Sequence, residues 1–221
     1  MRLPESRLAV LVSLPRNETA LAEAARHAGA DGLKVHTNVR HRASGTTFGS
    51  LDDEYERLRP ILALGVPTGL VVGAAGSVST TEMVAAHDMG FDYFDVYAAD
   101  APADYVDACG PVAAMVALGP GDGPSQARAL VRRGVRALEL STLEPERYGT
   151  PLSLGTLARL EAVASVVDVP VIVPSQHALE PRDLALLREA GAAAVLLGAV
   201  VTGADPSTFG ARIAPYVAAA A

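Results

Sequence analysis

Tryptophan is missing from the sequence, and cysteine and lysine occur only once each among its 221 residues. The single thiol, that of Cys109, cannot form an internal disulfide or a thiolate metal cluster, so we expect a reducing cytoplasm as the compartment. Aromatic residues make up 5% of the chain, which disfavours recognition of nucleic acid by base stacking. The net charge of −7 also disfavours broad binding to nucleic acid or anionic membranes, and we expect neither as a partner.

Long hydrophobic runs are missing too. The apolar stretch 8–14 is far shorter than a membrane span and ends at Pro15 and Arg16, without the small-residue cleavage site of a signal peptide. Half of the residues are nevertheless hydrophobic, which excludes a disordered chain. A mass of 22.7 kDa suffices for one well-buried core, so we expect a single compact domain over residues 1–221.

Short apolar runs alternate eight times with amphipathic stretches. The runs predict strands at 8–14, 32–37, 68–72, 93–97, 112–118, 136–140, 169–173 and 194–197. The stretches between and after them predict helices at 18–27, 52–64, 80–89, 103–109, 124–133, 154–166, 182–189 and 207–217. Helix N-caps are predicted at Asn17, Ser79, Ser153 and Asp205. Glycines that end helices in a left-handed conformation are predicted at Gly29, Gly65, Gly90, Gly134 and Gly191.

Eight βα units fit either a closed (β/α)8 barrel or an open doubly wound sheet. Eight parallel strands close naturally into a barrel. An open sheet of the nucleotide-binding kind would carry a glycine-rich loop after its first strand, whereas residues 14–17 contain no glycine. The sequence therefore predicts an α/β protein with the (β/α)8 TIM-barrel fold.

The last quarter of the chain resembles the ribulose-phosphate-binding type of (β/α)8 barrel. The residues that carry the resemblance are Val169-Pro170-Val171-Ile172-Val173, the helix 182–189, Gly191-Ala192 and Val195-Leu196-Leu197-Gly198-Ala199. The group includes sugar-phosphate epimerases, the tryptophan and histidine pathway barrels and thiamine-phosphate synthase. The resemblance implies a phosphate site at the ends of the last two strands. Gly198-Ala199 fits that pattern, whereas Pro174-Ser175-Gln176 stands where a glycine pair is usual.

Backbone amides after the third, seventh and eighth predicted strands are candidates for binding a phosphate. They belong to Gly73, Gly198, Ala199 and Gly203. Ser175 and Gln176 follow the seventh strand and offer side-chain donors for a substrate. Small residues in loops are also ordinary turn formers, and this alternative stays open.

Lys34 is the main catalytic candidate. Strand alternation places Lys34, His36 and Asn38 on one face, and in a barrel the polar face of a strand points inward. Every other basic residue of the chain except the histidines is arginine, so a lone lysine indicates chemistry that arginine cannot perform, such as imine formation or proton transfer. We expect its replacement to abolish activity without preventing folding.

Two acidic residues on other predicted strands are candidate partners of Lys34. Glu139 lies between two leucines near the end of the sixth strand, and Asp95 lies near the end of the fourth. Either is a candidate general acid or base, and we assign His36 to the same catalytic group. The alternative is a structural salt bridge that fills the barrel.

The connection 37–50 is long for a βα loop and carries Arg40, His41 and Arg42. Between Lys34 and Arg42 the chain has three positive charges and no acid. We expect these residues and Asn38 to bind an anionic substrate, with the loop closing over it. A solvated basic loop and an oligomer contact are the alternatives.

Together these features predict a metabolic enzyme that acts on a small anionic, phosphorylated carbonyl or sugar compound. Lys34 would form a Schiff base or stabilise an enolate, and an isomerase or epimerase is favoured over an aldolase-like lyase. The alternative is a non-catalytic barrel that binds an anionic metabolite or a partner subunit, with its polar residues self-satisfied and no open pocket. We expect no cofactor and no metal. The apolar C-terminal helix is expected to close the barrel or to form a homo-oligomer.

Overall fold

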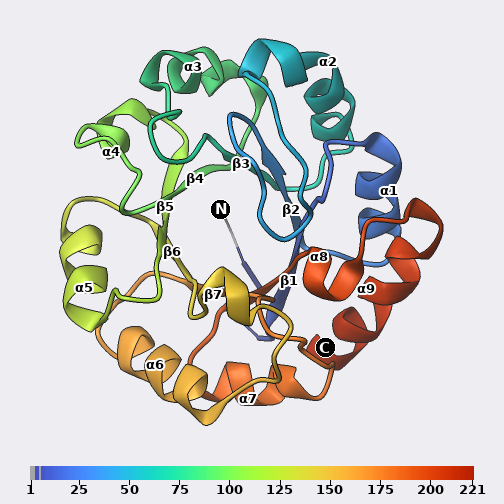
Figure 1. Cartoon of the computed structure of the whole chain (residues 1–221), viewed down its shortest axis with the longest axis vertical. Coiled ribbons are helices and arrows are strands. Elements are labelled where there is room, and N and C mark those ends of the chain that lie inside the picture. Colours follow the sequence, from blue (N-terminus) through green and yellow to red (C-terminus); the bar gives the residue numbers. More distant parts are fainter. Residues whose placement is uncertain (1–2, 5) are drawn as a thin grey trace.

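The computed structural model, which describes residues 3–4 and 6–221, is a closed barrel of eight parallel strands (Figure 1). Each strand pairs with the next in sequence, and β8 pairs with β1 to close the barrel. The strands are β1 (Ala9–Ser13), β2 (Gly32–His36), β3 (Thr68–Val71), β4 (Tyr93–Tyr97), β5 (Ala113–Leu118), β6 (Ala137–Leu140), β7 (Val171–Pro174) and β8 (Ala194–Leu197). The predicted (β/α)8 barrel is confirmed.

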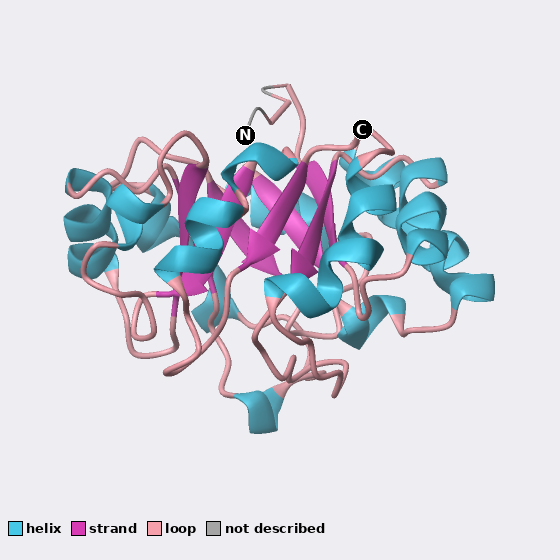
Figure 2. Cartoon of the chain, turned by 90° about the horizontal axis from the view of Figure 1, so that it is seen from above, coloured by secondary structure: helices cyan, strands magenta, loops and turns pink. Residues whose placement is uncertain are grey.

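Helices cover the outside of the barrel (Figures 1 and 2). They are α1 (Thr19–His27), α2 (Leu51–Leu62), α3 (Thr80–Ala85), α4 (Tyr105–Ala108), α5 (Pro124–Arg132), α6 (Leu154–Ala164), α7 (Asp183–Glu189), α8 (Ala199–Thr202) and α9 (Pro206–Ala220). Two short 3-10 turns are η1 (His87–Met89) and η2 (Pro145–Arg147). Among the described residues, no helix has the length and apolar character that crossing a bilayer requires.

The apolar core has two parts, as the alternation of side chains along each strand requires. Outward-facing residues such as Leu33 and Val35 are fully buried between the sheet and the helices. Inward-facing residues such as Leu11, Tyr93 and Met115 fill the barrel itself. The polar inward residues come later in their strands, so they lie toward the mouth at the C-terminal ends.

Most predicted element boundaries hold. Ser79, Ser153 and Asp205 accept the N-capping hydrogen bonds predicted for them. The prediction for Asn17 is wrong, because α1 begins after Glu18 and the buried Asn17 amide instead donates to the His36 carbonyl and to Glu54. The glycines predicted to end helices all have positive φ: Gly29, Gly65, Gly90, Gly134 and Gly191.

Two predicted helices are shorter in the structure, and one short helix was not predicted. The helix expected at 103–109 is reduced to the four residues of α4, and the helix expected at 80–89 ends at Ala85 and is followed by η1. The one-turn helix α8 lies in a segment that we expected to be a loop. The last helix, α9, packs against α1, α7 and β1 and buries Phe209 and Ile213, so it closes the helical ring as expected.

Candidate active site

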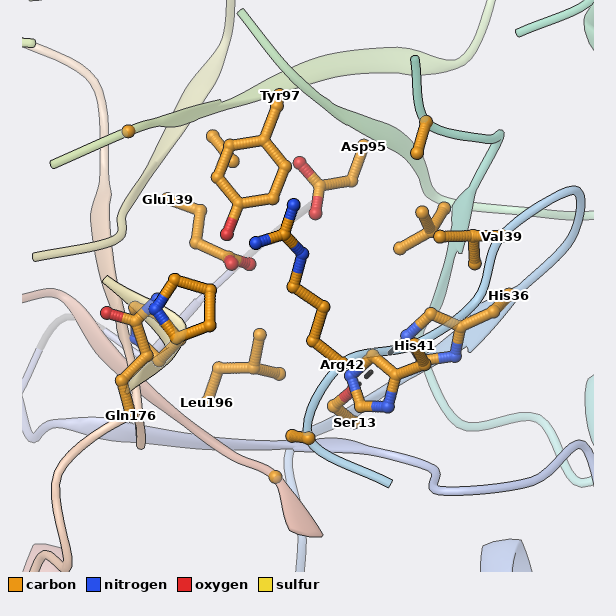
Figure 3. A pocket seen from close by; sticks show the side chains of 18 of the residues that line it. Ser13, His36, Val39, His41, Arg42, Asp95, Tyr97, Glu139, Gln176 and Leu196 are labelled. Carbon is orange, nitrogen blue, oxygen red and sulfur yellow. Dashed lines mark hydrogen bonds between the residues drawn. The ribbon is translucent and has the colours of Figure 1, made fainter. Parts of the chain in front are cut away.

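A cavity of about 400 Å³ opens at the C-terminal ends of the strands (Figure 3). Most of the predicted site residues line it: Lys34, His36, Arg40, His41, Arg42, Gly73, Asp95, Glu139, Ser175, Gln176 and Gly198. They come from strands or loops on all sides of the barrel. The position agrees with the place where (β/α)8 enzymes carry their active sites.

Lys34, Asp95 and Glu139 form a buried cluster at the floor of this cavity. They come from β2, β4 and β6, and side chains from alternate strands share one layer inside such a barrel. The Lys34 Nζ donates to Asp95 Oδ2 at 3.0 Å and to Glu139 Oε2 at 2.5 Å. All three residues are at most 5% exposed. One ammonium is thus shared by two carboxylates away from bulk water.

The cluster shifts the protonation of its members. Burial alone would lower the pKa of Lys34, but the charges of Asp95 and Glu139 outweigh it and raise the pKa above its ordinary value. Burial raises the pKa of Glu139 to about 7, because the loss of hydration and the repulsion by Asp95 outweigh the attraction of Lys34. At neutral pH the lysine is therefore charged, while the pKa of Glu139 lies near the ambient pH.

Two neutral histidines stand beside the cluster. The ring of His36 lies 4.6 Å from that of His41 and stacks on Phe48 at 4.8 Å. Burial, together with the nearby His41 and Lys34, keeps the pKa of His36 well below its ordinary value, and burial lowers that of His41 to about 4. The His36 Nε2 is 3.4 Å from the Ser13 hydroxyl. Both rings are therefore uncharged at neutral pH and do not take up a proton from a bound ligand.

Two buried polar atoms in the cavity lining have no partner. Among the buried side-chain nitrogens and oxygens that the structure describes, only His36 Nδ1 and Asp95 Oδ1 lack a hydrogen bond. Leaving such groups unpaired is costly, so native proteins rarely do so without a reason. Both atoms belong to residues that line the cavity.

The segment between β2 and α2 folds into a small hairpin rather than an open loop. Arg40 and Thr47 form an antiparallel bridge, and the His41 amide donates to the Thr46 carbonyl at 2.8 Å. Phe48 is 4% exposed and anchors the base of the hairpin. The Arg42 side chain reaches from the tip into the cavity (Figure 3).

The ends of β7 and β8 are joined by side-chain hydrogen bonds. The Gly198 amide donates to the Ser175 hydroxyl at 2.7 Å. The Gln176 side-chain Oε1 accepts from the backbone amides of Thr142 and Leu143, at 2.8 and 3.0 Å. These residues line the cavity as predicted, yet they also hold the loop after β6 in place.

Three predicted site residues lie outside the cavity lining. Asn38 has a positive φ of 53° just beyond the end of β2, so it leaves the alternation that Lys34 and His36 follow. Its amide donates to Glu82 of α3 at 2.7 Å. Ala199 belongs to α8 and Gly203 follows that helix, and neither lines the cavity.

Two tyrosines that we did not predict line the mouth. The Tyr97 hydroxyl is 3.0 Å from the Ser141 hydroxyl, and the Tyr148 hydroxyl accepts from Gln176 Nε2 at 3.1 Å. Tyr97 follows Asp95 by two residues on the same strand, so alternation was a sufficient signal for it. Tyr148 lies in an irregular loop, where no periodicity identifies it.

No group of three or more histidine, cysteine, aspartate or glutamate residues in the described parts of the chain is arranged to hold a metal. Lys34 itself occupies the space between the two carboxylates.

The fold and the mouth cavity define the class as a (β/α)8 barrel with a polar interior site. No family model and no curated protein sequence matches the chain. Among solved structures, it is similar to tryptophan synthase from Mycobacterium tuberculosis, with a TM-score of 0.76 and 15% identity over 97% of this chain and 93% of that one.

Two further similar structures come from other enzymes. Thiamine phosphate pyrophosphorylase from Pyrococcus furiosus has a TM-score of 0.68 at 12% identity, covering 96% of this chain and 95% of that one. Phosphoribosyl anthranilate isomerase from Thermus thermophilus has a TM-score of 0.67 at 15% identity, covering 96% and 98%. At these identities the likeness shows the fold. It confirms, at that level, the resemblance to tryptophan-pathway and thiamine-phosphate synthase barrels.

Proposed function

We propose that the protein is an enzyme that moves a proton at the carbon next to the carbonyl group of a small anionic compound, as an isomerase or epimerase. The observation that carries the proposal is Glu139: a buried carboxyl with a pKa of about 7, hydrogen-bonded to an ammonium group, at the floor of an open cavity. A group that gains and loses a proton near neutral pH is suited to general acid–base catalysis.

In this mechanism the Glu139 carboxylate removes the proton from carbon, and the electron pair of the C–H bond moves toward the carbonyl oxygen. The Lys34 ammonium supplies the positive charge that stabilises the resulting enolate. In an α-hydroxy carbonyl compound, the hydroxyl proton moves to the former carbonyl oxygen and protonated Glu139 returns its proton to the former carbonyl carbon, so the isomerisation involves no net change in atoms or electrons. Neutral His36 lines the cavity beside these groups as a buried ring.

Asp95 acts through Lys34 in this proposal and is a positioning residue. Its Oδ2 accepts a hydrogen bond from the ammonium at 3.0 Å, alongside the bond that Glu139 accepts. The arrangement leaves the lysine oriented and charged before substrate arrives, so little reorganisation is needed during the reaction.

The same contacts disfavour a Schiff base. Imine formation requires a neutral amine, whereas the pKa of Lys34 is raised by its two carboxylate neighbours. Borohydride added together with the carbonyl compound should therefore leave no added mass on Lys34. An adduct at Lys34 would replace the enolate mechanism with covalent catalysis.

The alternative of a non-catalytic binding barrel predicts polar residues that satisfy one another and no open pocket. Lys34, Asp95 and Glu139 do pair with one another, but an open cavity lies above them and two buried polar atoms remain unpartnered. The names of two similar structures, a phosphoribosyl anthranilate isomerase and a thiamine phosphate pyrophosphorylase, also support an enzyme acting on a phosphorylated compound.

The test is exchange of carbon-bound hydrogen with solvent. The protein is incubated in D2O with a panel of phosphorylated aldoses, phosphorylated ketoses and 2-oxo acids, and deuterium incorporation is followed by proton NMR. We expect exchange into at least one compound, lost by a factor of about 100 or more in Glu139→Gln. Glu161→Gln, which alters an exposed glutamate of α6, is the matched control and should exchange normally. Exchange that persists in Glu139→Gln, or none with any compound, would overturn the proposal.

A further inference from the structure

At the ends of β7 and β8, the Gly198 amide and the Gln176 side chain are used by the chain itself. Ser175 stands where the related barrels have glycine, and its hydroxyl accepts the Gly198 N–H at 2.7 Å. The side chain of Gln176 is occupied by Thr142, Leu143 and Tyr148. An anion bound at this end of the mouth would have to displace these contacts.

A free cation lies on the other side of the mouth. Arg42 lines the cavity and is exposed, and none of the ion pairs among the described residues includes it. Figure 3 shows its guanidinium reaching from the hairpin into the cavity. Burial raises the pKa of Tyr148 on the loop after β6, and the positive charge of Arg42 acts against that rise. The guanidinium therefore projects far enough to act on the opposite loop.

The hairpin that carries Arg42 is held at its base. The Asn38 side-chain Nδ2 donates to Glu82 at 2.7 Å, and the Asn38 backbone carbonyl accepts from the Ser77 hydroxyl at 2.6 Å. The Gly49 amide donates to Glu54, which is 3% exposed. Because both ends of the hairpin are anchored, its tip presents Arg42 from the β2 side of the barrel.

The sum of the charged side chains that line the mouth does not favour an anion. Lys34 is committed to Asp95 and Glu139, and the acidic Asp100 and Glu144 also line the cavity. An anionic group therefore needs a direct contact with a guanidinium, which binds carboxylate or phosphate through two parallel hydrogen bonds. We propose that Arg42 binds the anionic group of the substrate from the β2 side, in place of the amide cradle at the ends of β7 and β8.

This inference deepens the proposed function, since it assigns the site of the substrate's anionic group. Its test needs no turnover. The probe is inorganic phosphate, with acetate as the carboxylate counterpart, titrated into 15N-labelled protein and followed by amide shifts. We expect saturable shifts in residues 38–49, with phosphate affinity about tenfold or more weaker in Arg42→Gln. Comparing the two anions shows whether the site prefers phosphate or carboxylate.

Three further variants separate the two candidate anion sites. In Gly198→Ala, at φ −120°, the new Cβ would lie 3.8 Å from the Ser175 hydroxyl oxygen, which is an ordinary contact. The barrel should therefore tolerate this methyl group, which occupies space beside the Gly198 amide at the end of β8. We expect this variant to bind phosphate as the wild type does. Arg59→Gln removes an exposed arginine of α2 and controls for net charge. Arg42→Lys keeps the charge without the planar fork and should bind with intermediate affinity.

Phosphate shifts confined to the amides of 198–200 and lost in Gly198→Ala would overturn the inference, as would the absence of saturable binding of either anion. The outcome is distinct from that of the proposed function. If Arg42→Gln loses phosphate binding while Glu139→Gln retains deuterium exchange, the acid–base proposal fails and the anion site stands.

Discussion

Lys34 is held by two buried carboxylates, so it contributes to folding as well as to the site. We expected from the sequence that the residue would matter for activity alone. The ion pairs at 3.0 and 2.5 Å revise that expectation, because removing one partner of a buried charge cluster leaves the others uncompensated. Lys34, for which we propose a role in the reaction, is also a buried part of the barrel interior.

Lys34→Met should lower the free energy of unfolding by about 3–5 kcal/mol at pH 7. The loss should be larger at pH 9, because Lys34 lowers the pKa of Glu139 and its removal raises that pKa further, so the unpaired carboxyl ionises only above neutral pH. Stability of the variant should therefore fall as pH rises through neutrality, measured by urea unfolding at both pH values. Arg59→Met, which removes an exposed ion pair, should cost less than about 1 kcal/mol at either pH. Equal losses for the two variants would contradict the buried-charge account.

At the scale of elements, the hairpin between β2 and α2 distinguishes this barrel. Its length and basic charge were evident in the sequence, but its hydrogen bonding was not. Phe48 joins it to the site by stacking on His36 at 4.8 Å. The expectation that this segment closes over a ligand stays a prediction.

Phe48→Ala should loosen the hairpin without opening the barrel. Removing a buried aromatic ring costs several kcal/mol of local packing, so the amides of His41 and Phe48 should exchange with solvent about tenfold faster or more. The amides of β6 should be unaffected. Thr47→Ala, at an exposed neighbouring position that keeps the backbone bridge, is the control. Unchanged exchange at His41 in hydrogen-exchange NMR would show that Phe48 does not hold the hairpin.

Across the whole molecule, the fold was predictable to a large extent because local signals repeat. Alternating runs and helix-ending glycines identified eight strands, and strand alternation placed Lys34, Asp95 and Glu139 inside the barrel. Asn38 was misplaced because a positive φ after β2 ends the alternation. The inward reach of Arg42 depends on contacts that no periodicity encodes. The expected homo-oligomer stays a prediction, for light scattering to test.

The interior of the barrel is apolar at its base and polar at its mouth. The lack of a side chain at Gly69 leaves room for the Tyr93 ring in the apolar part. A Cβ at that position would lie 2.0 Å from the Tyr93 ring, which packs inside the barrel. Gly69→Ala should therefore destabilise the protein by about 3 kcal/mol, measured by chemical denaturation. Gly121→Ala, where an added Cβ meets nothing within 4 Å, should have little effect. Comparable stability of the two variants would contradict the packing described.

The most direct test of the central claim is the titration of the Glu139 carboxyl, followed by 13C NMR of the labelled side chain. Glu139→Gln assigns its signal by difference. The account predicts a midpoint near pH 7, caused by burial beside Asp95 and only partly offset by Lys34. A midpoint at the ordinary glutamate value of 4.5 would contradict it, because such a carboxylate would stay ionised and could not return a proton at neutral pH.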